Sequence, residues 1–293
     1  MRYVTGLVVL FLFSCSGKQT ELVKESKRLS FTTPQHVTVQ GYTGHLMEPF
    51  ISRDGRWLFF NDLNDPSVNT NIYYAERIND TLFQFSGEVQ GLNSLFLDGV
   101  ASMDNTNNLY FISTRTYTQN YSTVYRGLFT NGSISQAELV AGISKQEPGL
   151  VDFDVEISAD GQAMYFSEGH FNQTGQPLTA DIILAGKSAT GFNRKADSET
   201  ILRSVNTNEL EYAAGISPDE LTLFFTRLPA ATAGMTARLY YATRDNKTMP
   251  FNVPRLVEEV TGFTEAISFS GDNLLYFHKR DIDYFQLYCI KKL

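Results

Sequence analysis

The chain has 293 residues, of which 42% are hydrophobic and 13% aromatic, so it is long and apolar enough to bury a large core. Its formal net charge of −8 argues against nucleic acid as a partner and against attachment to anionic lipid through a basic patch. Mild acidity is no evidence for a cationic partner, because it commonly serves solubility alone.

Residues 1–14 predict a signal peptide rather than a structural element. Arg2 precedes the apolar stretch 4–13, which is too short to span a bilayer. The stretch ends in Leu12-Phe13-Ser14-Cys15, which resembles the lipobox of bacterial lipoproteins. The resemblance implies cleavage before Cys15, acylation of that cysteine and a lipid anchor on the outer membrane of the cell envelope. The alternative is an ordinary secretory peptide whose cysteine is incidental.

Residues 15–30 predict the lipidated cysteine followed by a flexible tether, because the segment has little apolar pattern. The chain has two cysteines, so acylation of Cys15 leaves Cys289 alone and allows no disulfide. We expect Cys289, in an apolar strand-like run, to be a small buried hydrophobic residue.

From residue 31 onward, one pattern returns five times: a serine-and-acid turn, then an apolar strand that ends in an aromatic pair. The second aromatic residues of these pairs lie 51, 55, 59 and 52 residues apart; they are Phe60, Phe111, Phe166, Phe225 and Phe277. A regular period of about fifty residues is typical of a repeat architecture.

Each repeat is expected to contain up to four strands. Asp54-Gly55 and Asp160-Gly161 are hairpin signals between the first two strands. Adjacent aromatic residues on a strand point to opposite faces, so the aromatic pairs require burial on both sides. The third strands are predicted at 72–75, 124–127, 182–185, 239–242 and 287–290. Four repeats continue into a weaker fourth strand.

The fifth repeat stops at Leu293, just after its third strand. The segment 31–39 repeats the F-x-x-P-x-x-V spacing of the fourth strand at 251–257 and can supply the missing outer strand. The predicted fold over residues 31–293 is therefore all-β, a single five-bladed β-propeller of four-stranded blades, with its ring closed by an N-terminal strand.

The turn segments 52–60, 158–166 and 217–225 resemble the WD40-like (PD40, TolB-type) propeller repeat, whose core is S-P-D-G followed by an apolar strand. Copies 102–105 and 270–273 lack its glycine pattern. The resemblance implies a β-propeller. It implies little about chemistry, because the family includes non-catalytic envelope proteins, peptidase-associated propellers and lyases.

Acidic residues near the start of the first strands are expected at one mouth of the central channel. Because the strands are antiparallel, each first strand begins on the face where the second ends. His170, His278 and Arg280 reach this face from connecting loops, and such loops commonly carry binding residues. The predicted mouth residues are Glu48, Asp98, Asp152, Asp154, Glu156, Glu211, Glu265, Arg115 and Arg227.

The most acidic point is the run Asp152, Asp154 and Glu156, whose alternation places three carboxylates on one side of a strand. They predict either a cation site or an acid–base group whose pKa is raised by its neighbours. The structural alternative is that these acids cap backbone amides or pair with an arginine of an adjacent blade. Four scattered histidines have no metal-ligand spacing, so we expect neither a metal nor a cofactor.

Two functional hypotheses remain, because no serine hydrolase, zinc protease or nucleotide motif occurs. The first is a monomeric, non-catalytic binding or scaffold module that holds an envelope protein, peptide or glycan and touches the membrane only through its anchor. The second is a carbohydrate-active enzyme, a glycoside hydrolase or lyase. Five-bladed propeller glycosidases place three carboxylates around the channel mouth, and Glu48, Asp98 and Asp154 are candidates here.

Overall fold

The structure is a computed structural model that describes residues 24–64, 69–173, 175–229, 236–271 and 273–293. The predicted signal peptide, Cys15 and the first part of the predicted tether lie outside the described residues. Within the described ranges, no helix has the length and apolar character needed to cross a bilayer.

The described residues form an all-β fold with two short helices, as the sequence predicts. Unit one contains β2 (Met47–Ile51), β3 (Trp57–Asn61), β4 (Ile72–Asn79) and β5 (Leu82–Glu88). Unit two contains β6 (Asp98–Met103), β7 (Asn108–Ser113), β8 (Val124–Thr130) and β9 (Ser133–Leu139), with α1 (Tyr117–Asn120) between β7 and β8.

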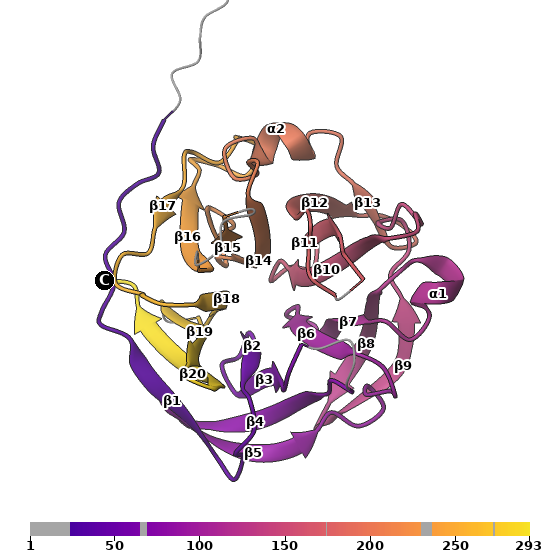
Figure 1. The fold of residues 1–293 in the computed structure, drawn as a ribbon, viewed down its shortest axis with the longest axis vertical. Coiled ribbons are helices and arrows are strands. Elements are labelled where there is room, and N and C mark those ends of the chain that lie inside the picture. Colours follow the sequence, from indigo (N-terminus) through magenta and orange to yellow (C-terminus); the bar gives the residue numbers. More distant parts are fainter. Residues whose placement is uncertain (1–23, 65–68, 174, 230–235, 272) are drawn as a thin grey trace, which may run out of the picture.

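The remaining units follow the same plan. Unit three contains β10 (Leu150–Ile157), β11 (Ala163–His170), β12 (Asp181–Lys187) and β13 (Phe192–Arg194), and α2 (Ser198–Leu202) follows it. Unit four contains β14 (Leu210–Ile216), β15 (Thr222–Leu228), β16 (Arg238–Thr243) and β17 (Arg255–Leu256). Unit five contains β18 (Thr264–Phe269), β19 (Leu274–Asp281) and β20 (Tyr284–Lys291). The units surround a common centre, with their first strands innermost (Figure 1).

The N-terminal strand β1 (Gln35–Gln40) lies between units five and one (Figure 1). Gln35–Val37 pair antiparallel with Leu287–Cys289 of β20, where the sequence places them. Thr38–Gln40 then pair in parallel with Leu82–Gln84 of β5, a contact that the sequence analysis does not anticipate. The strands β18, β19, β20, β1, β5, β4, β3 and β2 consequently form one sheet, whereas units two, three and four are separate four-stranded sheets.

The aromatic pairs are buried on both sides, as their spacing requires. Phe59 packs with Phe111 between units one and two, whereas its neighbour Phe60 packs with Tyr276 between units one and five. The other pairs divide in the same way between adjacent clusters. Burying about 25 cal/mol per Å² of apolar surface in these layers is the main force that holds the units together.

The segment 24–30 differs from the expected solvated tether. Ser26 is buried, its N–H donates to the Val253 carbonyl at 3.0 Å, and Leu29 packs near Phe224. Arg255 Nε donates to the Ser26 carbonyl at 2.8 Å. These contacts are made largely by the main chain, so they leave no hydrophobic pattern in the sequence. Residues 24–30, the later part of the predicted flexible tether, are therefore packed structure.

Candidate functional site

The five innermost strands share one backbone irregularity near the centre of the molecule. In each, one non-glycine residue has φ between 50° and 54°, in the left-handed region, and the pairing with the second strand shifts at the same place. Such a conformation costs of order 1–3 kcal/mol and often marks a functional site. We call these residues the central positions: Glu48, Val100, Asp154, Ala213 and Ala266.

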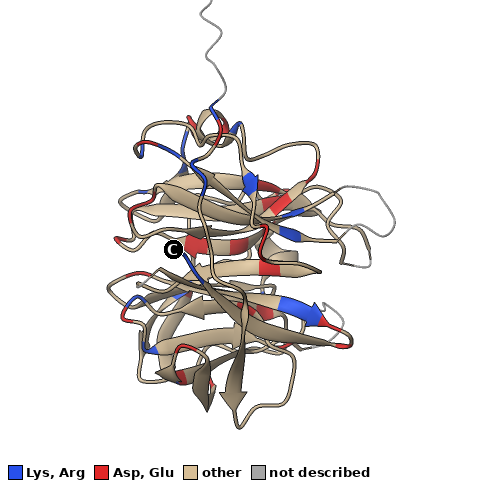
Figure 2. Ribbon diagram, turned by 90° about the vertical axis from the view of Figure 1, so that its left-hand side faces the viewer, with Lys and Arg blue, Asp and Glu red and all other residues tan. Residues whose placement is uncertain are grey.

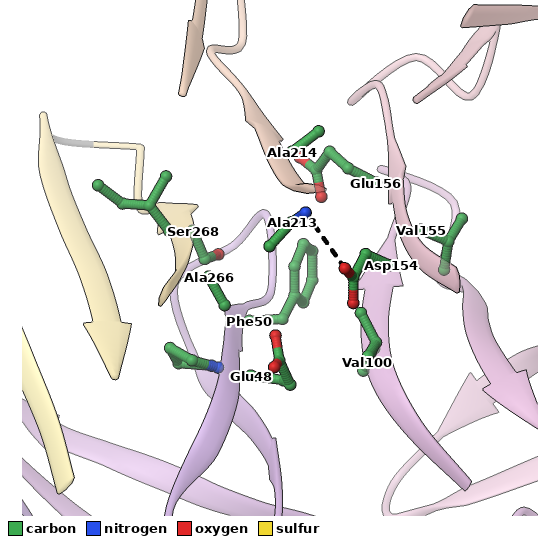
Figure 3. A pocket seen from close by; sticks show the side chains of 13 residues that line it. Glu48, Phe50, Val100, Asp154, Val155, Glu156, Ala213, Ala214, Ala266 and Ser268 are labelled. Atoms are coloured by element: carbon green, nitrogen blue, oxygen red, sulfur yellow. Dashed lines mark hydrogen bonds between the residues drawn. The ribbon is translucent and has the colours of Figure 1, made fainter. Parts of the chain in front are cut away.

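All five central positions line one pocket (Figure 3). Its free volume is about 30 Å³, which is enough for one or two water-sized molecules. Each central position lies four residues before the first residue of the following turn, and those turn residues are Ser52, Asp104, Ser158, Ser217 and Ser270. This spacing would have identified the ring from sequence.

Counting back twelve residues from the closing aromatic residue finds Glu48 in unit one and Asp154 in unit three, but it selects Glu265 in unit five. The turn of unit five is one residue shorter than that of unit one, so the central position is Ala266 and Glu265 precedes it. Two acids, Glu48 and Asp154, therefore occupy the ring itself. Figure 2 shows acids within the strands as well as on the loops.

The side chains of Glu48 and Asp154 point into the pocket (Figure 3). Asn64 Nδ2 donates to Glu48 Oε1 at 2.9 Å, whereas Glu48 Oε2 is buried with no hydrogen-bond partner among the described residues. The backbone N–H of Ala213 donates to Asp154 Oδ2 at 3.2 Å. An unpartnered buried carboxyl oxygen is costly unless it carries a proton or meets a ligand.

Glu265 lies beside this pair but is fully occupied by donors. The Tyr212 hydroxyl donates to Oε1, and His278 Nε2 lies 3.0 Å from Oε2. The other ring nitrogen, His278 Nδ1, accepts the backbone N–H of Glu48 at 3.1 Å. Because a backbone N–H can only donate, the ring proton resides on Nε2, from which it is donated to Glu265. Each carboxyl oxygen of Glu265 therefore accepts one hydrogen bond from a side chain.

This environment raises the pKa of both pocket acids. Burial, followed by the charges of Asp154 and Glu265, holds the pKa of Glu48 well above its usual value. Burial and then Glu265 raise the pKa of Asp154 to about 7, opposed by the Ala213 amide. No lysine or arginine in the described ranges contributes to either shift. Glu48 and Asp154 therefore titrate as a coupled pair that retains a proton near neutral pH.

Three other predicted mouth acids are structural. Asp98, Asp152 and Glu211 lie two residues before central positions, and each pairs with an arginine instead of reaching the pocket. The ion pairs are Asp98–Arg115 at 2.6 Å, Asp152–Arg194 at 3.3 Å and Glu211–Arg227 at 2.7 Å. Each arginine also donates to a backbone carbonyl: Arg115 to that of Leu92, Arg194 to that of Ile143 and Arg227 to that of Val205. Arg115 and Arg227, which the sequence predicts at the channel mouth, are thus held in ion pairs with buried acids.

The three acids of β10 do not form one cluster, contrary to the alternation argument. The left-handed residue Asp154 and the register shift beside it interrupt the regular alternation of side chains. Glu156 lines the pocket, but Arg53 lies 3.2 Å from its Oε1 and the Ser102 hydroxyl donates to its Oε2 at 2.6 Å. Asp154 and Glu156 therefore line one pocket with different hydrogen-bond partners, whereas Asp152 pairs with Arg194 outside it.

One group in the described residues has metal-ligand spacing: atoms of Glu48, Glu265 and His278 lie within 4.8 Å of one another. His278 cannot serve as a ligand as it is held, because one ring nitrogen accepts an amide proton and the other carries the proton given to Glu265. The site is better suited to proton transfer than to metal binding. Tyr212 and Asn64 were missed in the sequence because neither belongs to the repeat pattern.

Neither a scan against protein-family models nor a search of curated proteins gives a match. Solved structures do match, and several of them are glycoside hydrolases with propeller folds. A protein described as a glycoside hydrolase is 9% identical with a TM-score of 0.60, covering 90% of this chain and 92% of the other. An α-L-arabinofuranosidase from Podospora anserina, in complex with cellotriose, is 13% identical with a TM-score of 0.56, covering 92% and 98%.

A family 117 glycoside hydrolase from Zobellia galactanivorans is 9% identical with a TM-score of 0.52, covering 89% of this chain and 90% of the other. A structure described as a putative TolB from Agrobacterium tumefaciens also matches, 10% identical with a TM-score of 0.45, covering 91% of this chain and 89% of the other. At these identities the similarity establishes a β-propeller fold and leaves the chemistry to the residues of this chain.

Proposed function

We propose that the chain is a five-bladed propeller whose ring is closed by β1. The support is that β1 pairs with both β20 and β5, and that Phe60 and Tyr276 share one core cluster across units one and five. A closed ring leaves no long exposed sheet edge and brings the five central positions together.

We further propose that this propeller is a carbohydrate-active enzyme, a glycoside hydrolase acting at the central pocket. The observation that carries the proposal is the pair Glu48 and Asp154, buried together without a cation and with raised pKa values. Two carboxyl groups of this kind are what glycoside hydrolysis requires. The fold shared with glycoside hydrolases is consistent with this assignment.

The hydrogen bonds suggest how the roles divide. Glu48, whose Oε2 has no partner, carries the proton and donates it to the glycosidic oxygen as that bond breaks. Asp154, once ionised, deprotonates the attacking water or attacks the anomeric carbon itself. Glu265 accepts hydrogen bonds from Tyr212 and His278. Burial, followed by the charges of Asp154 and Glu265, favours the protonated form of Glu48 by raising its pKa.

Turnover of a panel of neutral polysaccharides tests the enzyme proposal. Glu48→Gln and Asp154→Asn should each lower turnover by about 10²- to 10⁴-fold without loss of folding. The matched control Glu258→Gln, in an exposed side chain, should keep full activity. Wild-type protein that turns over no member of the panel would count against hydrolysis.

A non-catalytic binding module is the second candidate, favoured by a pocket of about 30 Å³ that is too small to enclose a sugar ring. In that case the same mouth holds an envelope protein, peptide or glycan without cleaving it. Recovery of a bound partner from detergent-solubilised membranes, together with no turnover, would establish this function. For either function we propose a lipid anchor at Cys15 in the outer membrane.

A further inference from the structure

Two chains of aromatic contacts meet at Glu265, which lies beside the pocket acid Glu48. On one side, Tyr284 stacks on His45 at 5.0 Å between ring centroids, and His45 contacts Phe285 at 6.0 Å. Phe285 packs edge-on against His278 at 5.4 Å, and His278 hydrogen-bonds to Glu265, which lies beside the pocket acid Glu48. This side is built by the β19–β20 hairpin and the segment that enters β2.

On the other side, Tyr212 also hydrogen-bonds to Glu265 and lies 6.3 Å from the Phe153 ring. Phe153 in turn meets Phe171 edge-on at 5.1 Å. We call these six residues, none of them fully buried, the aromatic band: Tyr284, His45, Phe285, Tyr212, Phe153 and Phe171. The two sides join through Glu265.

The loops at this end of the strands are also unusually apolar. Of nine exposed large hydrophobic side chains in the described residues, five lie at this end: Leu95, Phe96, Leu178 and Ile282 in loops, and Tyr284 as the first residue of β20. Leu95 is 89% exposed and Ile282 is 91% exposed. Apolar side chains gathered at one end of a propeller, around a set of buried acids, are typical of a binding surface.

We infer that the aromatic band binds a neutral oligosaccharide that lies across the mouth, with sugar units stacked on rings on both sides of Glu265. This inference rests on the proposed carbohydrate function. The pocket volume sets the orientation: about 30 Å³ cannot admit a sugar ring, so the chain passes over the opening and the carboxyl groups reach it from below.

The chemistry of the band selects the ligand. The apolar face of a sugar packs on an aromatic ring, while its hydroxyl groups find donors and acceptors at the rim. The unit above the pocket is uncharged, because an anionic sugar would meet the neighbouring acidic side chains of Glu48, Asp154 and Glu265 at close range. Rings on both sides indicate that an internal part of the oligosaccharide, rather than its end, sits at the acids.

The test is calorimetric binding of cello-, xylo-, manno- and galacto-oligosaccharides, with uronate and sulfated oligosaccharides alongside. The full chain carries Glu48→Gln so that nothing is consumed. Tyr284→Ala on one side and Phe171→Ala on the other should each raise Kd about 3- to 10-fold. Ile78→Ala, near the end of β4, and Met249→Ala, in the loop between β16 and β17, change exposed side chains at the other end of the strands. They are matched controls and should leave Kd unchanged.

The outcomes separate the inference from the proposed function. Binding that weakens on both sides, even if the wild-type chain hydrolyses nothing, supports the band and refutes only the enzyme. Hydrolysis that neither variant affects supports the enzyme and overturns the band. Binding that depends on one side alone, binding of anionic oligosaccharides only, or no binding to any probe also overturns it. A circular dichroism melt of each variant excludes loss of folding as the cause.

Discussion

Phe31→Ala tests how firmly the N-terminal segment is built into the fold. Phe31 is 6% exposed and packs edge-on against Phe224 and Tyr241, with ring centroids 6.0 and 5.9 Å apart. The main chain is fixed on either side of it: Thr32 N–H donates to the Lys291 carbonyl and Leu293 N–H donates to the Ser30 carbonyl, both at 2.9 Å. The site therefore cannot collapse easily around a smaller side chain.

Replacing a buried phenylalanine by alanine costs about 3–5 kcal/mol, and more when the cavity cannot close. We expect about 3 kcal/mol here, because Phe31 lies near the outer edge of its cluster. Urea unfolding with linear extrapolation measures this change, and Leu293→Ala, at a side chain that is 78% exposed, is the control. A loss below about 1 kcal/mol would refute the view that this segment is part of the folded unit.

The other predictions concern charge and the anchor. A folded-state pKa raised above the unfolded value means that the native state binds more protons between the two values, so stability falls as pH rises from about 4 to 7. The pKa of Asp154 is raised to about 7, so Asp154→Asn should stabilise the protein at pH 8 by about 1–4 kcal/mol. Thermal melts at a series of pH values should show a weaker dependence of stability on pH in this variant. An unchanged dependence would contradict the raised pKa. Arg115→Ala leaves the fully buried Asp98 without its arginine and should lower the free energy of unfolding in urea by about 3–5 kcal/mol. Adding Asp98→Asn to the same chain should restore part of this loss. A change below about 1 kcal/mol would show that the ion pair does not stabilise the fold. Cys15→Ser should move the protein from the membrane to the soluble fraction, and continued sedimentation after a salt wash would refute the lipid anchor.

Much of the fold could be predicted because it depends on periodic apolar burial. The adjacent aromatic residues Phe59 and Phe60 required two buried faces, and the structure supplies them. The spare strand at the N-terminus was equally visible, because unit five lacks one. The packing of Ser26 was not, since main-chain hydrogen bonds impose no side-chain pattern.

The site was only partly predictable, for a physical reason. In a regular strand, successive side chains point to opposite faces of the sheet. A residue in the left-handed conformation at each central position interrupts this alternation, so counting along the strand no longer gives the correct face. Glu48 and Asp154 line the central pocket, whereas Asp98 and Glu211, two residues before central positions, pair with Arg115 and Arg227. The roles of Tyr212 and His278 depend on contacts between units, which no local pattern records.

The most direct test of the central claim is a carboxyl ¹³C NMR titration of the pocket acids, with Glu48→Gln and Asp154→Asn used to assign the signals. The account predicts that the pair retains a proton near neutral pH, with Asp154 titrating at about 7, and that Glu265→Gln lowers both apparent pKa values by removing the neighbouring charge. If Glu48 and Asp154 instead titrate near the ordinary carboxyl value of about 4, the pocket is not an acid–base site and the proposed chemistry is wrong.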